Sequence, residues 1–420
     1  MIASSRRTDP GHQALRPLHY YLVGTSGWFA CHGILTVMFA WLVTIVLHES
    51  PRMVGVAQTA MLVPAMLLML VGGSISDRYG GRRVAVVSQV VAAVPVVALW
   101  VVLTLDSLTF GFMIAFAVAM GCAQAFLTPA RDGLLNQVAG QRIQRTVALV
   151  TLVQFGIQIV AFLVAGQADR VGAGPVVLVQ AAALVIGAVA LARVAVPPIV
   201  VPRRSGSAVR ELARSVADGA RTVMGSRSMR AVVLQNFAVG LFFMGPYVVT
   251  IPLLVREVYD GSASDLAWLS TANAVGLIAA VFVLLMVGEV RRPGRLLLLA
   301  SGVGSVALGL AGAGFEFAAF VLCIGAWGSC AGLGMSMARM IMQERAPPDQ
   351  RGRVMAFFGF SFMSSAPLGT MLSGLMVEWW GAERALVVSA AAMLAALCAV
   401  GFASRLWSMD ARLAREAAVG

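Results

Sequence analysis

Long apolar runs, separated by short polar stretches that carry most of the charges, follow one another along the chain. A helix that crosses a membrane needs about 20 mostly apolar residues, and twelve runs are long enough. No run keeps a polar face over most of its length, as the helices of a soluble protein would. We therefore predict an all-α membrane protein with twelve transmembrane helices. The expected spans are 20–47, 53–76, 84–105, 108–130, 146–167, 174–196, 230–256, 265–289, 295–314, 317–342, 354–377 and 384–404.

A polar segment rich in arginine separates the first six runs from the last six. It opens with PPIVVPRRSGS and continues as VRELARSVADGARTVMGSRSMR, a pattern that predicts an amphipathic helix on the membrane surface. The chain is thus expected to divide into four parts. These are an N-terminal six-helix bundle (1–196), a linker with an amphipathic helix (197–229), a C-terminal six-helix bundle (230–404) and a cytoplasmic tail (405–420).

The two halves repeat one another at a nearly constant spacing. Matches of alanine or valine carry little weight in so apolar a chain, but charged residues are rare and their matches fall at the same loop of each half. Two pseudo-symmetric six-helix bundles are typical of transporters whose path lies between the bundles. The charged matches are Arg131 with Arg339, Arg145 with Arg353, Asp77 with Glu289 and Arg83 with Arg295.

The composition agrees with a membrane protein and excludes a nucleic-acid partner. Hydrophobic residues make up 59% of the chain and charged residues only 12%, against about 25% charged residues in soluble proteins. The net charge of +12 would suit nucleic acid only if the basic residues formed one face of a soluble domain, and here they form islands between apolar runs.

The placement of the arginines predicts the orientation in the membrane, because basic residues gather on the cytoplasmic side. With both termini in the cytoplasm, all but four of the 31 basic residues, every one an arginine, lie inside. The N-terminus lacks a short apolar region with a cleavage site, so we interpret it as a cytoplasmic leader and not as a signal peptide. We expect a multi-pass protein of the bacterial inner membrane. The four arginines expected outside are Arg52, Arg170, Arg256 and Arg384.

The loop between the second and third spans, GGSISDRYGGRRVAVV, carries a recognisable motif. It has the pattern Gly-x-x-x-Asp-Arg-x-Gly followed by basic residues, and in this the chain resembles the major facilitator superfamily. The resemblance implies a fold of two six-helix bundles that alternate access to the two sides of the membrane. At Gly81 the family usually has an arginine, a role that Arg82 can take. The motif residues are Gly73, Asp77, Arg78, Gly80, Arg82 and Arg83.

Two further stretches resemble a narrower branch, that of siderophore exporters and macrolide efflux pumps. They are AFLTPARDGLLNQVAG, followed by RTVAL, and ERAPPDQRGRVMAFFGF, followed by APLGTMLSG.

The family resemblance implies a latch that holds the bundles together on the cytoplasmic side when the transporter faces outward. Asp77 would meet the N-terminus of helix 11 near residues 352–354, where a carboxylate suits the positive end of the helix dipole. Arg131 would end helix 4, and the neighbouring Asp132 would receive Arg82.

The repeat predicts a weaker counterpart of this latch in the other half. Glu289 would face the start of helix 5, and Arg339 would end helix 10. Other loop arginines, such as Arg291, Arg292 and Arg351, are better explained by membrane orientation alone.

His32 is the only ionisable side chain expected near the middle of a span, because all the acidic residues fall near span ends or in loops. Thr25, Trp28, His32 and Thr36 follow helical spacing and form one polar and aromatic stripe. A histidine titrates near neutral pH and can couple proton entry to substrate exit. A structural histidine, hydrogen-bonded between helices, explains the residue equally well.

Other polar and aromatic residues at similar depth are candidates for a substrate cavity. Each amide taken alone is better explained by a hydrogen bond between helices than by contact with a substrate. Aromatic and methionine side chains suit bulky amphiphiles of varied shape, and Gly245-Pro246 and Pro367-Leu368-Gly369 would let helices 7 and 11 bend. The candidate cavity residues are Trp28, Thr36, Gln124, Gln154, Gln158, Gln235, Asn236, Phe243, Tyr247 and Asn273.

These features predict a secondary active transporter. We expect it to be a monomer whose partners are a small-molecule substrate, protons and membrane lipid. No Walker A loop supports ATP-driven transport, and no HExxH, paired CxxC or GxSxG motif supports an enzyme, so the proton gradient is the expected energy source and no cofactor is expected. We expect export of an amphipathic molecule, a drug-like compound or a siderophore, by proton antiport. An importer of a small solute, and a receptor or assembly protein that does not transport, remain alternatives.

Overall fold

The computed structural model of the chain describes residues 10–139, 143–195, 208–288, 290–348, 350–404 and 406–407. Throughout these residues every regular element is a helix. Twelve helices, or series of helices that run on without a break, are long and apolar enough to cross a membrane. The predicted fold class, an all-α membrane protein with twelve transmembrane helices, is confirmed.

The first half of the chain begins with a helix longer than the predicted span. This helix starts before residue 20 and is extended at its other end by a π-helical segment, Leu42–Val46. A proline suits the first turn of a helix, and α2 begins with one after the loop at 47–50. The helices are α1 (Pro10–Trp41), α2 (Pro51–Tyr79), α3 (Gly81–Thr104), α4 (Phe110–Ala139), α5 (Ile143–Ala165), the short α6 (Ala168–Val171) and α7 (Ala173–Ala192).

The second half contains one span that is not a regular α-helix. Two π-helical segments, Gly240–Met244 and Pro246–Thr250, lie within it on either side of Gly245. They join α9 (Arg227–Val239) to α10 (Ile251–Tyr259). The five remaining spans are α11 (Ala263–Val287), α12 (Pro293–Ala311), α13 (Phe317–Arg345), α14 (Arg351–Trp380) and α15 (Ala382–Ala403).

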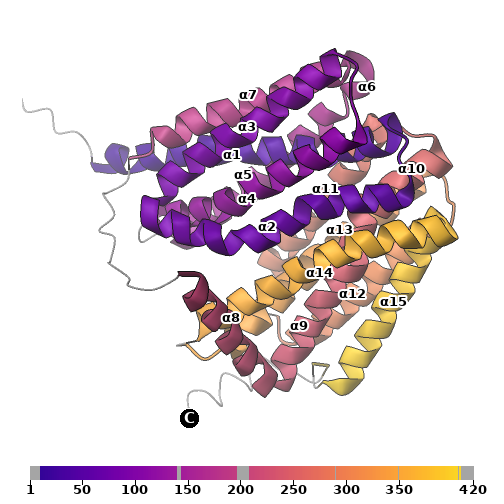
Figure 1. The fold of residues 1–420 in the computed structure, drawn as a ribbon. Helices are drawn as coiled ribbons and strands as arrows, with labels where there is room; N and C mark the ends of the chain where they lie inside the picture. Colours follow the sequence, from indigo (N-terminus) through magenta and orange to yellow (C-terminus); the bar gives the residue numbers. More distant parts are fainter. Residues whose placement is uncertain are drawn as a thin grey trace, which may run out of the picture.

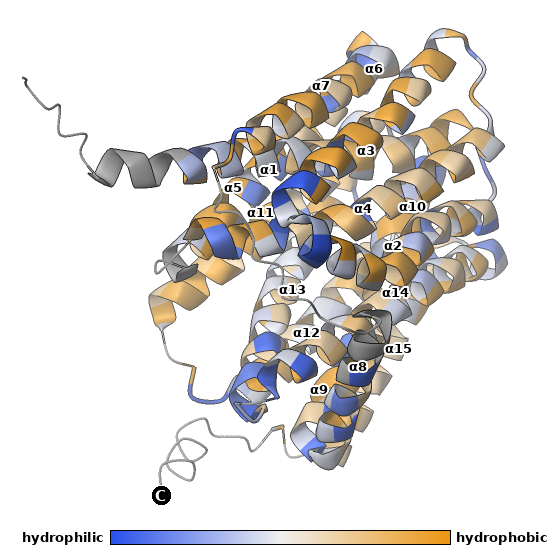
Figure 2. Ribbon diagram, turned by 60° about the vertical axis from the view of Figure 1, so that its left-hand side comes forward, coloured by the Kyte–Doolittle hydropathy of each residue, from blue (hydrophilic) through white to orange (hydrophobic). Residues whose placement is uncertain are grey.

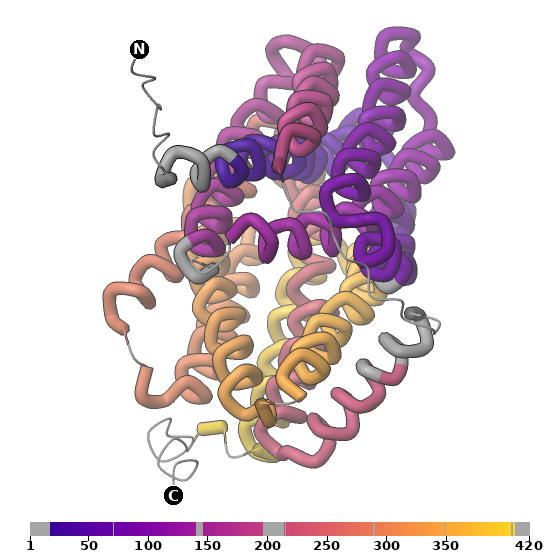
Figure 3. The backbone as a smooth tube through the Cα atoms, turned by 90° about the vertical axis from the view of Figure 1, so that its left-hand side faces the viewer, coloured from indigo at the N-terminus to yellow at the C-terminus, as the bar shows by residue number. Residues whose placement is uncertain are grey.

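The helices of each half pack mainly with one another. In the first half α2 packs on α4, and α7 packs on both α1 and α3; in the second half α13 packs on both α11 and α12. Seen from the side of α8, the helices of the first half lie above those of the second (Figure 3). Hydrophilic residues gather at the helix ends and on α8, while the lengths between them are hydrophobic (Figure 2).

Glycines let neighbouring helices approach until their backbones touch. A Cβ atom on Gly72 of α2 would collide with the carbonyl oxygen of Ala125 on α4, and one on Gly121 of α4 would collide with that of Met61 on α2. Between helices in lipid there is no hydrophobic driving force, so close packing at small residues supplies much of the attraction. Gly72 therefore fixes how α2 crosses α4.

The two bundles touch at one end of the molecule, called here the closed end, which carries the loops at 47–50, 167–172 and 260–262. There α2 of the first bundle crosses α14 of the second. A Cβ atom on Gly374 would lie 2.7 Å from the carbonyl oxygen of Pro51, and one on Gly55 would lie 2.9 Å from that of Thr370. One helical turn further on, the hydroxyls of Thr59 and Thr370 are 2.8 Å apart.

Toward the other end, called the α8 end because α8 (Ala208–Gly225) lies there, α2 and α14 diverge (Figure 1). Between Thr59 and Tyr79 the helix α2 rises about 30 Å. Over this length no hydrogen bond or ion pair within the described ranges joins the two bundles. The molecule is thus closed at one end and parted at the other.

Replacing Gly374 by leucine is expected to force the closed end open, because its side chain would occupy the space of the Pro51 backbone. Spin labels on Leu105→Cys and Phe315→Cys, two exposed positions at the closed end of opposite bundles, would move apart in pulsed electron resonance measurements. Gly374→Ala should give a smaller shift in the same direction.

Gly111→Leu is the matched control, because a Cβ atom on Gly111 would have nothing within 4 Å. An unchanged distance in Gly374→Leu, or the same increase in Gly111→Leu, would show that this glycine contact does not hold the end closed.

Candidate functional site

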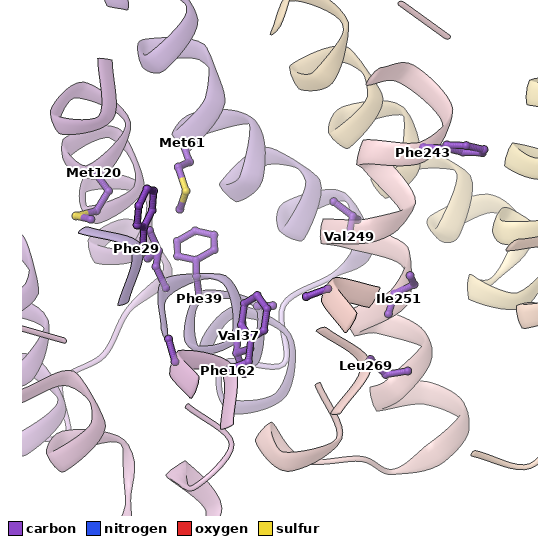
Figure 4. Packing of buried hydrophobic residues seen from close by; sticks show 14 of the residues in the cluster. Phe29, Val37, Phe39, Met61, Met120, Phe162, Phe243, Val249, Ile251 and Leu269 are labelled. Carbon is purple, nitrogen blue, oxygen red and sulfur yellow. The ribbon is translucent and has the colours of Figure 1, made fainter. Parts of the chain in front are cut away.

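A small cavity lies where the two bundles meet, between the closed end and the parted region. It has a volume of about 20 Å³, roughly enough for one water molecule. Thr36 of α1 and Tyr247 of the second bundle both line it. Figure 4 shows Val37 of α1 facing Ile251 and Leu269 across this contact. The cavity is therefore bordered by both bundles.

An aromatic cluster from the second bundle stands beside this cavity. The ring of Trp327 on α13 packs edge-on against Phe243, with centroids 5.4 Å apart, and is tilted against Tyr247 at 6.0 Å. Trp327 is buried, and within the described residues its indole nitrogen has no hydrogen-bond partner. Buried indole N–H groups usually find an acceptor, so this donor is free for one. The sequence reasoning missed Trp327, although it is one of only eight tryptophans.

The expected stripe on α1 is present as one helix face. Trp28 stacks on His32 with ring centroids 6.3 Å apart and planes at 22°. One turn further toward the closed end, the Thr36 hydroxyl donates a hydrogen bond to the His32 carbonyl over 2.8 Å. His32 is half-buried, and its imidazole forms no hydrogen bond with any residue whose placement is described. A hydrogen bond from this ring to another helix, the structural explanation of His32, is not found in those residues.

Three of the six candidate amides form hydrogen bonds that connect helices. Gln235 is buried and donates to the Ser301 hydroxyl of α12 over 3.0 Å. Asn236 donates to the carbonyl of Phe358 and to the hydroxyl of Ser361, both on α14. Asn273 donates to the carbonyl of Ile324 over 3.4 Å. For Gln235 and Asn236 in particular, the expected place in the cavity is corrected to a place between helices.

The other three amides, all in the first bundle, differ from these. Gln124 of α4 and Gln154 and Gln158 of α5 are half-buried, and none of them forms a hydrogen bond within the described part of the chain. An amide with unused donors and acceptors can bind a polar group of a ligand. These three are the amides that fit a substrate path.

The motif loop between α2 and α3 depends on two adjacent glycines. Gly80, between the two helices, has φ of +90°, a backbone conformation that favours glycine. A Cβ atom on Gly81 would lie 2.6 Å from the carbonyl oxygen of Ala130 on α4. The packing of α3 on α4 thus explains why glycine replaces the family's usual arginine at this position.

The charged residues of the motif do not meet the second bundle in this conformation. Asp77 is exposed and, among the described residues, has no hydrogen-bond or ion-pair partner. Arg82 donates to the carbonyl of Val194, while Asp132 accepts from Arg131 over 3.1 Å. The expected contact between Arg82 and Asp132 is therefore absent here, because each has a different partner.

Arg131 is held against α1 as well as by its neighbour. Its guanidinium lies over the ring of Phe29, 5.0 Å from the centroid, and its carbonyl accepts a hydrogen bond from the Tyr21 hydroxyl. In the counterpart of the latch, Arg339 is exposed and forms no ion pair within the described ranges, and Glu289 lies outside the described residues.

The helix α8 packs against the first turn of α14, the place where Asp77 was expected to bind. Asp218 of α8 accepts from Arg353 over 3.3 Å, and Thr222 donates to Gln350. Gly219 brings the two backbones together, since a Cβ atom there would collide with the Arg353 carbonyl. In this conformation the carboxylate beside the first turn of α14 comes from α8.

Two polar contacts at the closed end were not predicted. The Arg256 guanidinium donates to the carbonyls of Thr44, over 3.0 Å, and Glu49, over 2.8 Å. Asp169, just after α5, accepts from the backbone N–H groups of Ala263 and Ser264 at the start of α11. A carboxylate at a helix N-terminus is favourable, but nothing in the sequence pairs residues so far apart in the chain.

A sequence profile of the Major Facilitator Superfamily matches residues 22–370 and 232–409. The chain belongs to this superfamily. It is a multi-pass membrane transporter of this type, and its two bundles with a central contact are those of the superfamily fold. No curated protein matches the chain by sequence.

Solved structures of superfamily transporters show the same fold. The nucleoside transporter NupG superposes with a TM-score of 0.70 at 12% identity, over 93% of this chain and 98% of that one. A POT family transporter in complex with 5-aminolevulinic acid gives 0.69 at 12% identity, over 94% and 97%. A bacterial homologue of the human lysosomal transporter Spinster gives 0.64 at 15% identity, over 95% and 97%. At these identities the likeness concerns the fold alone.

Amides that form a hydrogen bond between helices and amides that form none to a described residue are expected to differ in their contribution to stability. Ser301→Ala leaves the buried Gln235 amide without its acceptor, which should lower the free energy of unfolding by about 1 kcal/mol. Gln154→Ala removes no hydrogen bond made to a described residue and should stay within about 0.5 kcal/mol. Thermal unfolding in detergent micelles measures both; equal losses would contradict the assignment of Gln154 to the path.

Proposed function

We propose that this superfamily transporter exports an amphipathic small molecule, a drug-like compound or a siderophore, in exchange for protons. The observation that carries the proposal is the placement of the α1 stripe and the aromatic cluster on opposite sides of the contact between the bundles. Thr36 and Tyr247 line the same small cavity. His32 lies on the same helix as Thr36, and Trp327 packs against Tyr247. An apolar and aromatic site with a few polar groups suits an amphipathic ligand.

The proposed site supplies two kinds of contact. Trp327, Phe243 and Tyr247 would pack against the apolar part of the substrate, and the free indole N–H of Trp327 would donate to an acceptor on it. On the first bundle, Gln154 and Gln158 would bind its polar groups through their unused amides. The resemblance of two sequence stretches to siderophore exporters and macrolide efflux pumps supports this substrate class.

His32 is the proposed site of proton coupling. Its ring is free of hydrogen bonds to described residues and half-buried on the face that also carries Thr36. Protonation would place a charge in a poorly hydrated site, and substrate and proton would then compete for it. Alternating occupancy by the two is the requirement for antiport.

The α8 end is the proposed cytoplasmic end, in the bacterial inner membrane. All four arginines expected outside belong to the closed end: Arg52 begins α2, Arg170 lies in α6, Arg256 ends its span and Arg384 begins α15. With the remaining arginines inside, the molecule obeys the positive-inside rule. The conformation described would then be open toward the cytoplasm.

Transport by purified protein in liposomes with an imposed pH gradient tests this function. A panel of fluorescent amphipathic dyes and metal-free siderophores serves as probe. Wild-type protein should move at least one of them against its gradient when protons flow the opposite way. His32→Ala should keep downhill movement and lose the dependence on the pH gradient, whereas His48→Asn, at an exposed loop with positive φ, should behave as wild type.

Other results of the transport assay would support a different function. Substrate and protons moving in the same direction would indicate an importer. No flux of any probe under any gradient would favour a protein that kept the fold without transporting. An unchanged pH dependence in His32→Ala would remove His32 from the proposal while leaving transport intact.

We further propose that two carboxylates compete for the first turn of α14. Asp218 of α8 binds there when the cytoplasmic end is open, and Asp77, unpartnered among the described residues, would bind there when it closes. Both sites are partly exposed, so each contact is worth about 1 kcal/mol or less. That free energy corresponds to at most about a fivefold change in the ratio of the two conformations.

Substituting either carboxylate should therefore move the equilibrium in opposite directions. Spin labels on Gln137→Cys and Gln343→Cys, exposed positions on α4 and α13 at the α8 end, report the separation of the bundles. Asp77→Asn should increase the population with parted bundles, and Asp218→Asn should decrease it. Asp106→Asn, in the loop before α4, should change neither; shifts in the same direction for both variants would contradict the competition.

A further inference from the structure

A groove runs along the outer side of the first bundle, between α2, α3 and α4. Its volume is about 770 Å³. Among the described residues, none of the second bundle and none of α1 or α5 lines it. It is therefore separate from the contact between the bundles and faces the surroundings of the protein, which in a membrane are lipid.

The groove has the length of one bilayer leaflet. Arg83, Val87, Val91 and Pro95 lie on successive turns of α3 along one wall. From Arg83 to Pro95 the helix rises about 18 Å, against about 15 Å for half of a hydrocarbon core about 30 Å thick. Apart from Phe126, the side chains of α4 that line the opposite wall are small: Ala119, Cys122 and Ala123. Small residues there leave the space that neighbouring helices fill elsewhere.

Charge marks one end of the groove. Arg83 lies at the α8 end, exposed, and within the described residues it forms no hydrogen bond or ion pair. Tyr79, 55% exposed, lies beside it with its ring under the guanidinium of Arg78. Deeper in, the lining is apolar apart from the buried Ser88. The groove thus combines a cationic mouth with an apolar slot.

We propose that this groove binds an anionic phospholipid from the leaflet on the α8 side, with one acyl chain in the slot and its phosphate on Arg83. An acyl chain matches the slot in length and polarity, and a free phosphate would leave the apolar walls uncovered. A basic residue near the surface of a bilayer favours anionic over zwitterionic lipid. The lipid would sit on the loop that also carries Asp77, so it would hold the turn between α2 and α3 in place.

The reactivity of Cys122 tests the proposal on the wild-type protein. Cys122 lines the groove and is half-buried, whereas Cys398 on α15 is exposed. In delipidated protein in detergent, phosphatidylglycerol should slow maleimide labelling of Cys122 and leave the rate at Cys398 unchanged. Phosphatidylcholine should protect Cys122 only at concentrations about fivefold higher.

Variants assign the two halves of the site. Arg83→Gln should raise the phosphatidylglycerol concentration needed for protection about fivefold and remove the preference over phosphatidylcholine. Arg291→Gln, which changes an exposed arginine at the same end, is the matched control and should keep the preference for phosphatidylglycerol. Cys122→Phe should fill the slot, so that native mass spectrometry finds less retained lipid than in Leu152→Phe, an exposed position on α5.

The contrary results are equally definite. Labelling of Cys122 at the same rate with and without phosphatidylglycerol would exclude a bound acyl chain. Equal protection by both lipids, unchanged by Arg83→Gln, would exclude recognition of the headgroup. Protection that phosphatidylglycerol and inorganic phosphate give alike would show an anion effect without a lipid site. The labelling result stands even if Cys122→Phe fails to fold.

Discussion

The contact of backbone with backbone at Gly55 and Gly374 is the constraint on which the rest of the arrangement depends. It brings α2 and α14 together at one end only, and the other ten spans pack with one or the other of them as two bundles. Near this contact, the space bordered by both bundles is a cavity of only about 20 Å³. Because they diverge beyond Thr59, the charged residues near the α8 ends of α2 and α14 do not contact one another and bind other partners. Arg353 then pairs with Asp218, and Arg82 donates to the carbonyl of Val194.

The spans were predictable because each consists of enough apolar residues to cross a membrane, a property of the residues alone. The motif loop was predictable for a similar reason, since charge is rare in this chain. The partners of those charges were not predictable. Asp218 reaches Arg353 only because Gly219 allows α8 to touch α14. Asp169 reaches Ser264 only because the two bundles are in contact at the closed end. Contacts between distant segments depend on the conformation as much as on the sequence.

The candidate site shows the same division. Thr36 and His32 fell on one face because α1 is a regular α-helix through them, so spacing in the sequence is spacing in space. The amides could not be sorted by residue type, since a glutamine in a membrane serves equally well between helices or toward a cavity. Only the presence of Ser301 opposite Gln235, and the absence of any described partner for Gln154, distinguishes them. Trp327 was overlooked because it lies in a long run of mostly apolar residues.

The π-helical segments on either side of Gly245 alter how the seventh span must be read. Each i→i+5 turn holds more residues than an α-helical turn, so the two ends of this span are rotated out of phase with a single helical wheel. Gln235 precedes both segments and Tyr247 lies in the second. A wheel drawn continuously through the span therefore gives a false angle between them. In this helix the direction of a side chain is set by the local winding of the backbone, and a change in that winding would turn Tyr247 without moving Gln235.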